Sequence, residues 1–251
     1  MLVWLFVLGT SEASDCSPGK SDAFTWDLRN VQTELAQMIN RRGRPRGRRP
    51  PARSQGPLPS TVVNEVKDVP KEKEDVPKSE TPYLYQYNNA IDGSGSCQNT
   101  SVAMVLNQYG VKITPDELSR RFGTDLAKTP HGLERLFNTV AAEAGLPQRI
   151  TAHTDGRLED IDALLDAGKP VIVNGWFTRS GHVIVTTGKT ADGYKVNDPS
   201  GKWNGQFKGS YSGHTSTNGN GAVYSKESYY SSVATSNGST FLPIWYYEIS
   251  P

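Results

Sequence analysis

Residues 93–110 read GSGSCQNTSVAMVLNQYG, and the change from glycine and serine to apolar residues in this stretch predicts the start of a helix. Cys97 stands at the N-terminus of that helix, where unpaired backbone N–H groups and the positive end of the helix dipole favour a thiolate. A structural cysteine would fit better within the apolar face of the helix, so we interpret Cys97 as a reactive thiol. That face is formed by Val102, Val105, Leu106 and Tyr109.

Helical patterns come before strand patterns along the rest of the chain. Three further helices are predicted over 115–122, 131–145 and 158–168, and a β-like segment, TPYLYQY, precedes the cysteine at 81–87. Short β-branched runs then predict strands over 170–176, 181–190, 193–199 and 241–249, while YSKESYYSS (224–232) fits a short helix or a strand. The remainder of 205–240 is rich in Gly, Ser, Thr and Asn and predicts long loops. This order indicates an α+β fold, with the cysteine helix packed on an antiparallel sheet.

His182 and Asp198 occupy neighbouring predicted strands. His182 follows Gly181 and opens the strand VIVTTG, and Asp198 ends the next strand sixteen residues later. An ADG turn joins the two strands, so an antiparallel pairing brings the end of the second strand close to the start of the first. We therefore predict that Asp198 accepts a hydrogen bond from His182 and that His182 is the base for Cys97.

Gln86 is a candidate donor to a developing oxyanion. Its side-chain amide and the backbone N–H of Cys97 together would stabilise a tetrahedral intermediate. The other three histidines are weaker candidates for the base, because His131 precedes a helix and His153 and His214 lie in polar segments without a nearby strand carboxylate.

The stretches YQYNN…GSGSCQNTSVAMVLNQYG, PVIVNGWFTRSGHVIVTTG and YKVNDPSG resemble the C-39-type peptidases over about residues 83–201. That family is papain-like and is related to the domain that trims double-glycine leaders in bacteriocin exporters. The resemblance implies a Cys–His–Asp triad with an upstream glutamine, which correspond here to Cys97, His182, Asp198 and Gln86. It also implies a peptide or protein substrate and no cofactor.

The chain departs from the family pattern in two places. Gln86 lies eleven residues before Cys97, about twice the gap common in papain-like enzymes. Gln98 and Asn99 replace the glycine-containing sequence usual after the cysteine in the exporter domains. The chain also contains no recognisable nucleotide-binding cassette or membrane span, which favours a free-standing enzyme over a leader-processing exporter.

Composition and the N-terminal region limit the other function classes. The net charge is +1, so there is no global attraction to nucleic acid, although 41–53 carry seven arginines. Residues 1–20 have the apolar run of a signal segment, which predicts a secreted or cell-envelope protein without stable membrane insertion. We interpret 21–81 as a helix (22–40) followed by a disordered Arg/Pro-rich linker or pro-segment, and 82–251 as the peptidase domain. We expect a monomer.

The sequence therefore predicts a thiol-dependent hydrolase, a cysteine peptidase or amidase, that forms a thioester intermediate. The same residues also suit an acyl transferase of the transglutaminase type or a deamidase. A different class remains open, namely a non-catalytic module that binds peptide or glycan through an aromatic surface formed by Trp203, Tyr229, Tyr230, Trp245 and Tyr246. Asn174, Trp176 and Trp203 are expected near the cleft. A zinc site is disfavoured because the scattered histidines offer no ligand spacing.

Overall fold

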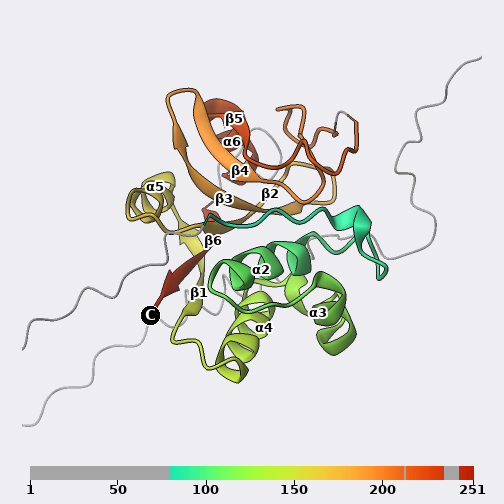
Figure 1. Ribbon diagram of the computed structural model, residues 1–251. Helices are drawn as coiled ribbons and strands as arrows, with labels where there is room; N and C mark the ends of the chain where they lie inside the picture. Colours follow the sequence, from blue (N-terminus) through green and yellow to red (C-terminus); the bar gives the residue numbers. More distant parts are fainter. Residues whose placement is uncertain (1–79, 212, 235–242) are drawn as a thin grey trace, which may run out of the picture.

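The structure is a computed structural model that describes residues 80–211, 213–234 and 243–251 (Figure 1). The predicted signal segment (1–20), the predicted helix (22–40) and nearly all of the predicted linker lie outside the described residues, and so these predictions remain open. Within the described residues, no helix is both long enough and apolar enough to cross a membrane.

One antiparallel sheet of six strands forms the centre of the domain, in the order β1-β6-β2-β3-β4-β5. Strand β6, the last in sequence order, lies between β1 and β2 and is therefore next to the edge strand β1 (Figure 1). The strands are β1 (Arg149–Gly156), β2 (Val171–Gly175), β3 (His182–Thr190), β4 (Gly193–Asn197), β5 (Ala222–Ser225) and β6 (Ile244–Ser250).

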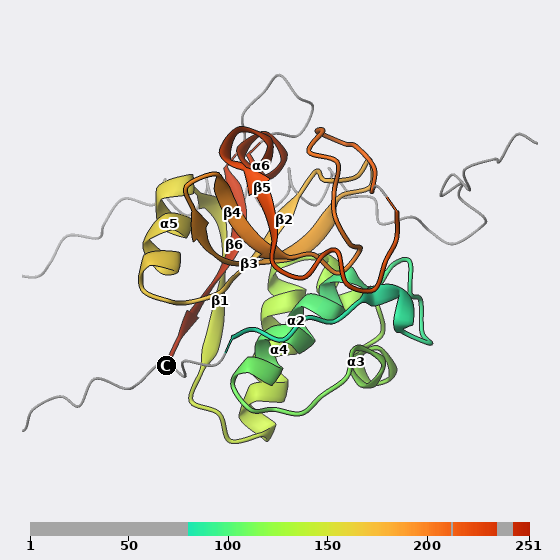
Figure 2. The ribbon, with the colours of Figure 1, turned by 45° about the horizontal axis from the view of Figure 1, so that its top comes forward.

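Helices cover both faces of this sheet. On one face lie α2 (Cys97–Gln108), α3 (Pro115–Phe122) and α4 (Pro130–Glu143), and on the other lie α5 (Leu158–Asp166) and α6 (Lys226–Val233) (Figures 1 and 2). Two short 3-10 helices, η1 (Gln86–Asn88) and η2 (Leu126–Lys128), complete the described elements. Each face has its own apolar core because alternate strand residues point to opposite sides. In β2, Ile172 packs toward α2 and α4, whereas Val171 and Val173 pack toward α5 and α6.

The cysteine helix α2 is buried on almost every side. All of its residues except Asn107 are buried, including the polar residues Thr100 and Ser101, which are not part of the predicted apolar face. Their hydroxyls are satisfied internally, since Thr100 donates to the carbonyl of Ser96 at 2.8 Å and Ser101 donates to the carbonyl of Val183 on β3 at 3.1 Å. The second of these bonds ties the first two turns of α2 directly to the strand that begins at His182.

The predicted α+β arrangement is confirmed, with the cysteine helix on an antiparallel sheet, and the structure differs from or refines the local predictions in three places. Residues 81–87 form extended coil and the start of η1 instead of a strand, because Pro82 has no N–H for a ladder and the segment bonds irregularly to the end of β4. Strand β1 was not predicted. The segment 224–232 divides into the end of β5 and most of α6.

The aromatic surface proposed for a binding module does not exist as a unit. Trp203, Tyr229 and Tyr246 are buried, with exposed fractions of 2%, 0% and 6%, and belong to the core between the sheet and α5/α6. Of the five aromatic residues in that prediction, only Tyr230 is exposed.

The substitution Phe137→Ala on α4 tests the packing of the apolar core that lies against the cysteine helix. The Phe137 ring is fully buried, so Phe137→Ala leaves a cavity and should lower the free energy of unfolding by about 3–5 kcal/mol. Urea denaturation followed by circular dichroism measures the change. Arg135→Ala on the exposed side of the same helix is the control and should change stability by no more than about 0.5 kcal/mol. Equal effects of the two substitutions would contradict this description of the core.

Candidate active site

Cys97 is the first residue of α2 and a free thiol. In the first turn of a helix the backbone N–H groups have no carbonyl partner one turn earlier, so those of Cys97 and its neighbours point out of the helix end. Ser96, the residue before the helix, does not cap these groups with its hydroxyl, which instead accepts a bond from the amide of Asn89 at 2.9 Å. Cys97 is only 5% exposed, as a structural cysteine would be, but it lies close enough to the imidazole of His182 to raise the pKa of that ring.

His182 is the first residue of β3 and pairs with Gly175 of β2. The preceding Gly181 has a φ of 83°, a left-handed conformation that a tight turn from Thr178 requires. The Nε2 atom of His182 lies 2.8 Å from Oδ1 of Asp198. Since Nε2 is engaged there, Nδ1 is the ring nitrogen that remains for the sulfur of Cys97.

Asp198 follows directly after β4, where the antiparallel pairing of Val185 with Asn197 carries it to the beginning of β3. Its carboxylate is fully buried and accepts four hydrogen bonds. Oδ1 accepts from His182 and from the backbone N–H of Ser200 at 2.9 Å. Oδ2 accepts from the hydroxyls of Tyr211 at 2.9 Å and Tyr224 at 2.8 Å. The hydrogen bond predicted between His182 and Asp198 is therefore present.

The surroundings of His182 raise its pKa from the ordinary 6.5 to about 10. Burial of the ring acts in the opposite direction, because desolvation favours the neutral imidazole. The negative charges of Asp198 and Cys97, and the hydrogen bonds to both, outweigh it. The site thus favours the imidazolium form of His182, held between Asp198 and Cys97.

Tyr211 and Tyr224 were not found by the sequence reasoning. Tyr211 comes from the loop region of 205–240, and Tyr224 comes from β5. Burial, reinforced by the charge of Asp198, raises the pKa of both phenols well above the ordinary value, so both remain hydrogen-bond donors. The ring of Tyr211 also meets that of His182 edge-on, with centroids 5.5 Å apart. Nothing in the local sequence marks these tyrosines, because only the packing of the loop and β5 brings them to Asp198.

Gln86 lies at the start of η1 and is buried beside the same carboxylate. Its Oε1 accepts from the hydroxyl of Ser200 at 2.9 Å, and its Nε2 donates to the carbonyls of Gly93 at 2.9 Å and Ser94 at 3.2 Å. Both amide hydrogens therefore hold the loop that leads to Cys97. To donate to an oxyanion, Gln86 must give up its hydrogen bond to the carbonyl of Gly93 or Ser94. Its role as an oxyanion donor therefore stays a prediction.

Gln98 and Asn99 tie the first turn of α2 to the end of α3. Gln98 donates from Nε2 to the carbonyls of Gly95 at 3.0 Å and Thr124 at 2.6 Å, and its Oε1 accepts from the thiol of Cys97 at 3.3 Å. Asn99 donates from Nδ2 to Ser119 Oγ at 2.9 Å and to the carbonyl of Gly123 at 3.1 Å. The two residues that depart from the family pattern thus anchor the first turn of α2 to the segment at the end of α3.

Three further residues were expected near the cleft, namely Asn174, Trp176 and Trp203, and the structure gives the contacts of each. Asn174 precedes the partner of His182 on β2 and is buried with neither amide atom hydrogen-bonded. Trp203 packs edge-on against Phe177, whose ring in turn lies edge-on to His182. Trp176 carries the ammonium of Lys208 over its ring at 4.5 Å.

The other histidines do not reach the cysteine in the described structure. His131 lies inside the first turn of α4 instead of preceding a helix, and His153 lies on β1, not in a loop. His153 bonds to Glu248 at 3.1 Å. His214 lies in a loop, as predicted, where its Nδ1 is 3.3 Å from the carbonyl of Ser200 and its ring meets that of Tyr87.

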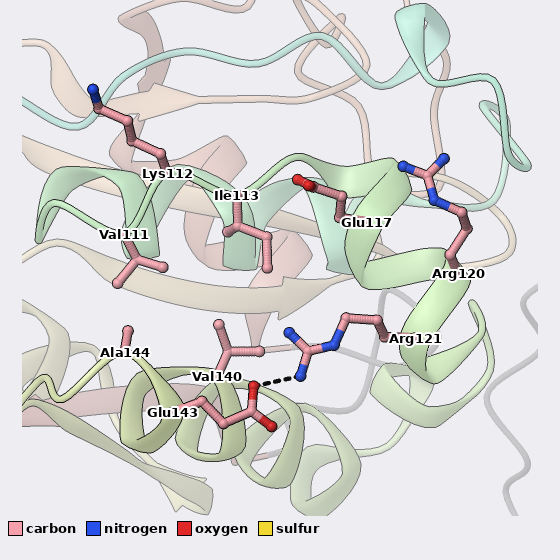
Figure 3. A pocket seen from close by; sticks show the side chains of 9 residues that line it. All are labelled: Val111, Lys112, Ile113, Glu117, Arg120, Arg121, Val140, Glu143 and Ala144. Carbon is pink, nitrogen blue, oxygen red and sulfur yellow. Dashed lines mark hydrogen bonds and ion pairs between the residues drawn. The ribbon is translucent and has the colours of Figure 1, made fainter.

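A depression of about 370 Å³ lies elsewhere, between α3, α4 and residues 111–113 (Figure 3). Apolar side chains such as Val140 form part of it, and the ion pair of Arg121 with Glu143 crosses it. It contains none of the predicted site residues, so we do not assign the chemistry to it. In the described part of the chain, no group of three or more His, Cys, Asp or Glu residues is arranged to hold a metal ion.

Residues 78–236 match the family model described as Peptidase_C39 like family, which is more than half of the chain. The chain belongs to this family. Its membership supports a function of the cysteine peptidase type, and the helix-on-sheet arrangement above is the papain-like fold expected for the C39-like peptidases. No match is found among curated proteins.

Two solved structures are similar to this C39-like chain. One is described as a C39-like peptidase from Bacillus anthracis, with 16% identity and a TM-score of 0.39 over 49% of this chain and 81% of that chain. The other is a double glycine motif protease from an AMS/PCAT transporter in complex with the leader peptide, with 16% identity and a TM-score of 0.42 over 67% of this chain and 92% of that chain.

Asp198→Asn tests the electrostatics of the site, because it keeps the size of the side chain and removes its charge. The pKa of His182 should fall from about 10, since the charge that chiefly raises it is lost. Nitrogen-15 NMR of the histidine ring across pH 5–11 measures the shift. Asp166→Asn, which removes an exposed partner of Lys189, is the control and should leave the His182 titration unchanged. An unaltered titration in Asp198→Asn would refute the assigned coupling.

Proposed function

We propose that this C39-like protein is a thiol-dependent hydrolase that cleaves peptide or amide bonds through Cys97, His182 and Asp198. The observation that carries the proposal is the hydrogen bond between the His182 ring and the buried carboxylate of Asp198, together with the closeness of Cys97, which raises the pKa of the same ring. A nucleophile, a base and a group that orients the base are the components that acyl transfer requires.

The reaction begins with transfer of the thiol proton to Nδ1 of His182, and the thiolate then attacks the carbonyl carbon of the substrate. The backbone N–H of Cys97 at the open helix end stabilises the oxyanion of the tetrahedral intermediate, and Gln86 assists if it releases a loop carbonyl. The imidazolium next protonates the leaving amine, and a thioester remains on Cys97. His182 then deprotonates a water molecule, which attacks the thioester and releases the acid and the free thiol.

Asp198 acts by orientation and charge. Its bond to Nε2 keeps Nδ1 directed at the sulfur and stabilises the imidazolium that forms in each half of the reaction. Because Tyr211 and Tyr224 occupy Oδ2, only Oδ1 is left for the ring, which restricts the imidazole to one orientation.

Cys97→Ala should abolish the activity, with a loss of roughly 10⁴-fold or more because the nucleophile is removed. Cleavage of a peptide library, read by mass spectrometry, measures the loss and identifies the substrates at the same time. Labelling by iodoacetamide should be lost at the peptide that contains residue 97 and should persist at Cys16, the chain's second cysteine, in samples that retain it. Retained cleavage in Cys97→Ala would exclude this sulfur as the nucleophile.

Acyl transfer to an amine and deamidation of glutamine use the same intermediates. Adding hydroxylamine during turnover distinguishes a transferase from a hydrolase, since a transferase passes most of the acyl group to the amine. A non-catalytic binding module is the less favoured function, because the aromatic residues proposed for its surface are mostly buried.

We also propose that the protein is exported and that residues 21–81 restrain the peptidase domain until they are cleaved. The linker's paired arginines, such as Arg48 and Arg49, make it accessible to trypsin-like proteases. The rate of a chain that starts at Thr81 should exceed that of the full chain in the same peptide assay. Equal rates for the two chains would remove the inhibitory role and leave the triad proposal untouched.

A further inference from the structure

The carboxamide of Gln98 presents its oxygen to the sulfur of Cys97. Gln98 is fully buried at the second position of α2, and its Oε1 lies 3.3 Å from Sγ as the acceptor of the thiol proton. The thiol thus directs its one proton to Gln98 Oε1, while the nearby His182 ring, whose pKa Cys97 raises, competes for the same proton.

The orientation of this amide is determined by its other contacts. Its nitrogen donates to two backbone carbonyls, those of Gly95 and Thr124. If the amide turned over, its oxygen would face these two acceptors and its nitrogen would face the sulfur, so that two carbonyls would lose their donor. The surrounding backbone thus keeps an oxygen, not an N–H group, against the sulfur.

An oxygen in this position distinguishes between the two protonation states of the cysteine. The neutral thiol donates a hydrogen bond to it, whereas a thiolate has no proton to donate and meets the lone pairs of Oε1 at short range. We propose that Gln98 is a positioning residue that stabilises the protonated thiol of Cys97 and so opposes the thiolate–imidazolium pair that His182 and Asp198 favour. This inference rests on the proposed function, since it concerns the nucleophile of that reaction.

The opposing influences come from different sides of the sulfur. His182 and Asp198 belong to the sheet and favour transfer of the proton away from Cys97. Gln98 belongs to the helix, is bonded to Thr124 beyond the end of α3, and favours retention of the proton. A resting enzyme with both features keeps part of its sulfur as the less reactive thiol until a substrate displaces or replaces the contact with Gln98.

Asn99 offers a matched control on the next residue. Its amide is buried and donates to Ser119 and to the carbonyl of Gly123, the residue beside Thr124, so it ties the same part of the chain to α2. No contact of Asn99 with the sulfur is present. A substitution at Asn99 therefore weakens the same junction without changing what faces Cys97.

The test is the rate of iodoacetamide alkylation of Cys97 in the full chain between pH 4 and 10, with the labelled peptide measured by mass spectrometry. Gln98→Met removes the oxygen and nearly keeps the length of the side chain. The ratio of its rate at pH 5.5 to its plateau at high pH should rise by roughly three- to tenfold, as expected when one hydrogen bond to the neutral form is lost. Gln98→Glu, which is isosteric and adds negative charge, should lower that ratio. Asn99→Leu should leave the ratio unchanged, whatever it does to the melting temperature.

An unchanged ratio in Gln98→Met would overturn the inference and leave Gln98 with an anchoring role alone. If Gln98→Met does not fold, Gln98→Glu provides the test. A ratio of alkylation rates in Gln98→Glu that equals or exceeds that of the native protein would then overturn the inference. The proposed function fails by a different observation, namely native Cys97 that reacts no faster near neutral pH than it does in His182→Ala.

Discussion

The buried carboxylate of Asp198 is the interaction on which the rest of the site depends. A carboxylate that is fully removed from water is costly unless donors surround it, and here four donors do so. They come from the start of β3, the turn after β4, the loop that carries Tyr211 and the strand that carries Tyr224. The charge thus holds together segments that are distant in the sequence, and it does so at the position where His182 needs an orienting partner.

The segment before the cysteine is attached to the same point. The hydroxyl of Tyr83 donates to the carbonyl of Asp198, the N–H of Gln86 donates to the carbonyl of Pro199, and the side chain of Gln86 bonds to Ser200. Gln86 also holds the carbonyls of the loop that leads to Cys97. The end of β4 therefore positions both the imidazole, directly, and the entry to the cysteine helix, through Gln86. Disturbing the turn at 198–200 would affect the two halves of the site together.

The cysteine helix itself is an exception to ordinary amphipathic packing. A helix with apolar residues on one face usually lies at the surface, but α2 lies between the sheet and α3/α4 with its polar side chains buried as well. The hydroxyls of Thr100 and Ser101 and the Nδ2 group of Asn99 each find a partner in the helix, in β3 or at the end of α3, although Oδ1 of Asn99 has none among the described residues. This network costs conformational freedom but leaves the sulfur with a single position relative to the sheet, and electrostatic catalysis benefits from such preorganisation.

Most elements, and the order of the candidate site residues along them, could be predicted from residue patterns alone. Hydrophobic periodicity predicted α2 to α5 and the strands β2, β3, β4 and β6. The ADG turn between two β-branched runs was enough to predict that Asp198 lies near His182. The reason is that an antiparallel pair joined by a tight turn has only one register that buries its apolar face. Strand β1 was missed because its alternation is weak, and 81–87 was misjudged because alternation alone does not show whether a sheet edge will accept the segment. The surroundings of Cys97, His182 and Asp198, in contrast, follow from the packing of segments that are distant in the sequence. The hydrogen bonds of Tyr211 and Tyr224 join distant segments, and the contact of Gln98 with Cys97 depends on the direction of one amide. Residue spacing predicts neither of these, because the energy of such bonds depends on which groups the packing has removed from water.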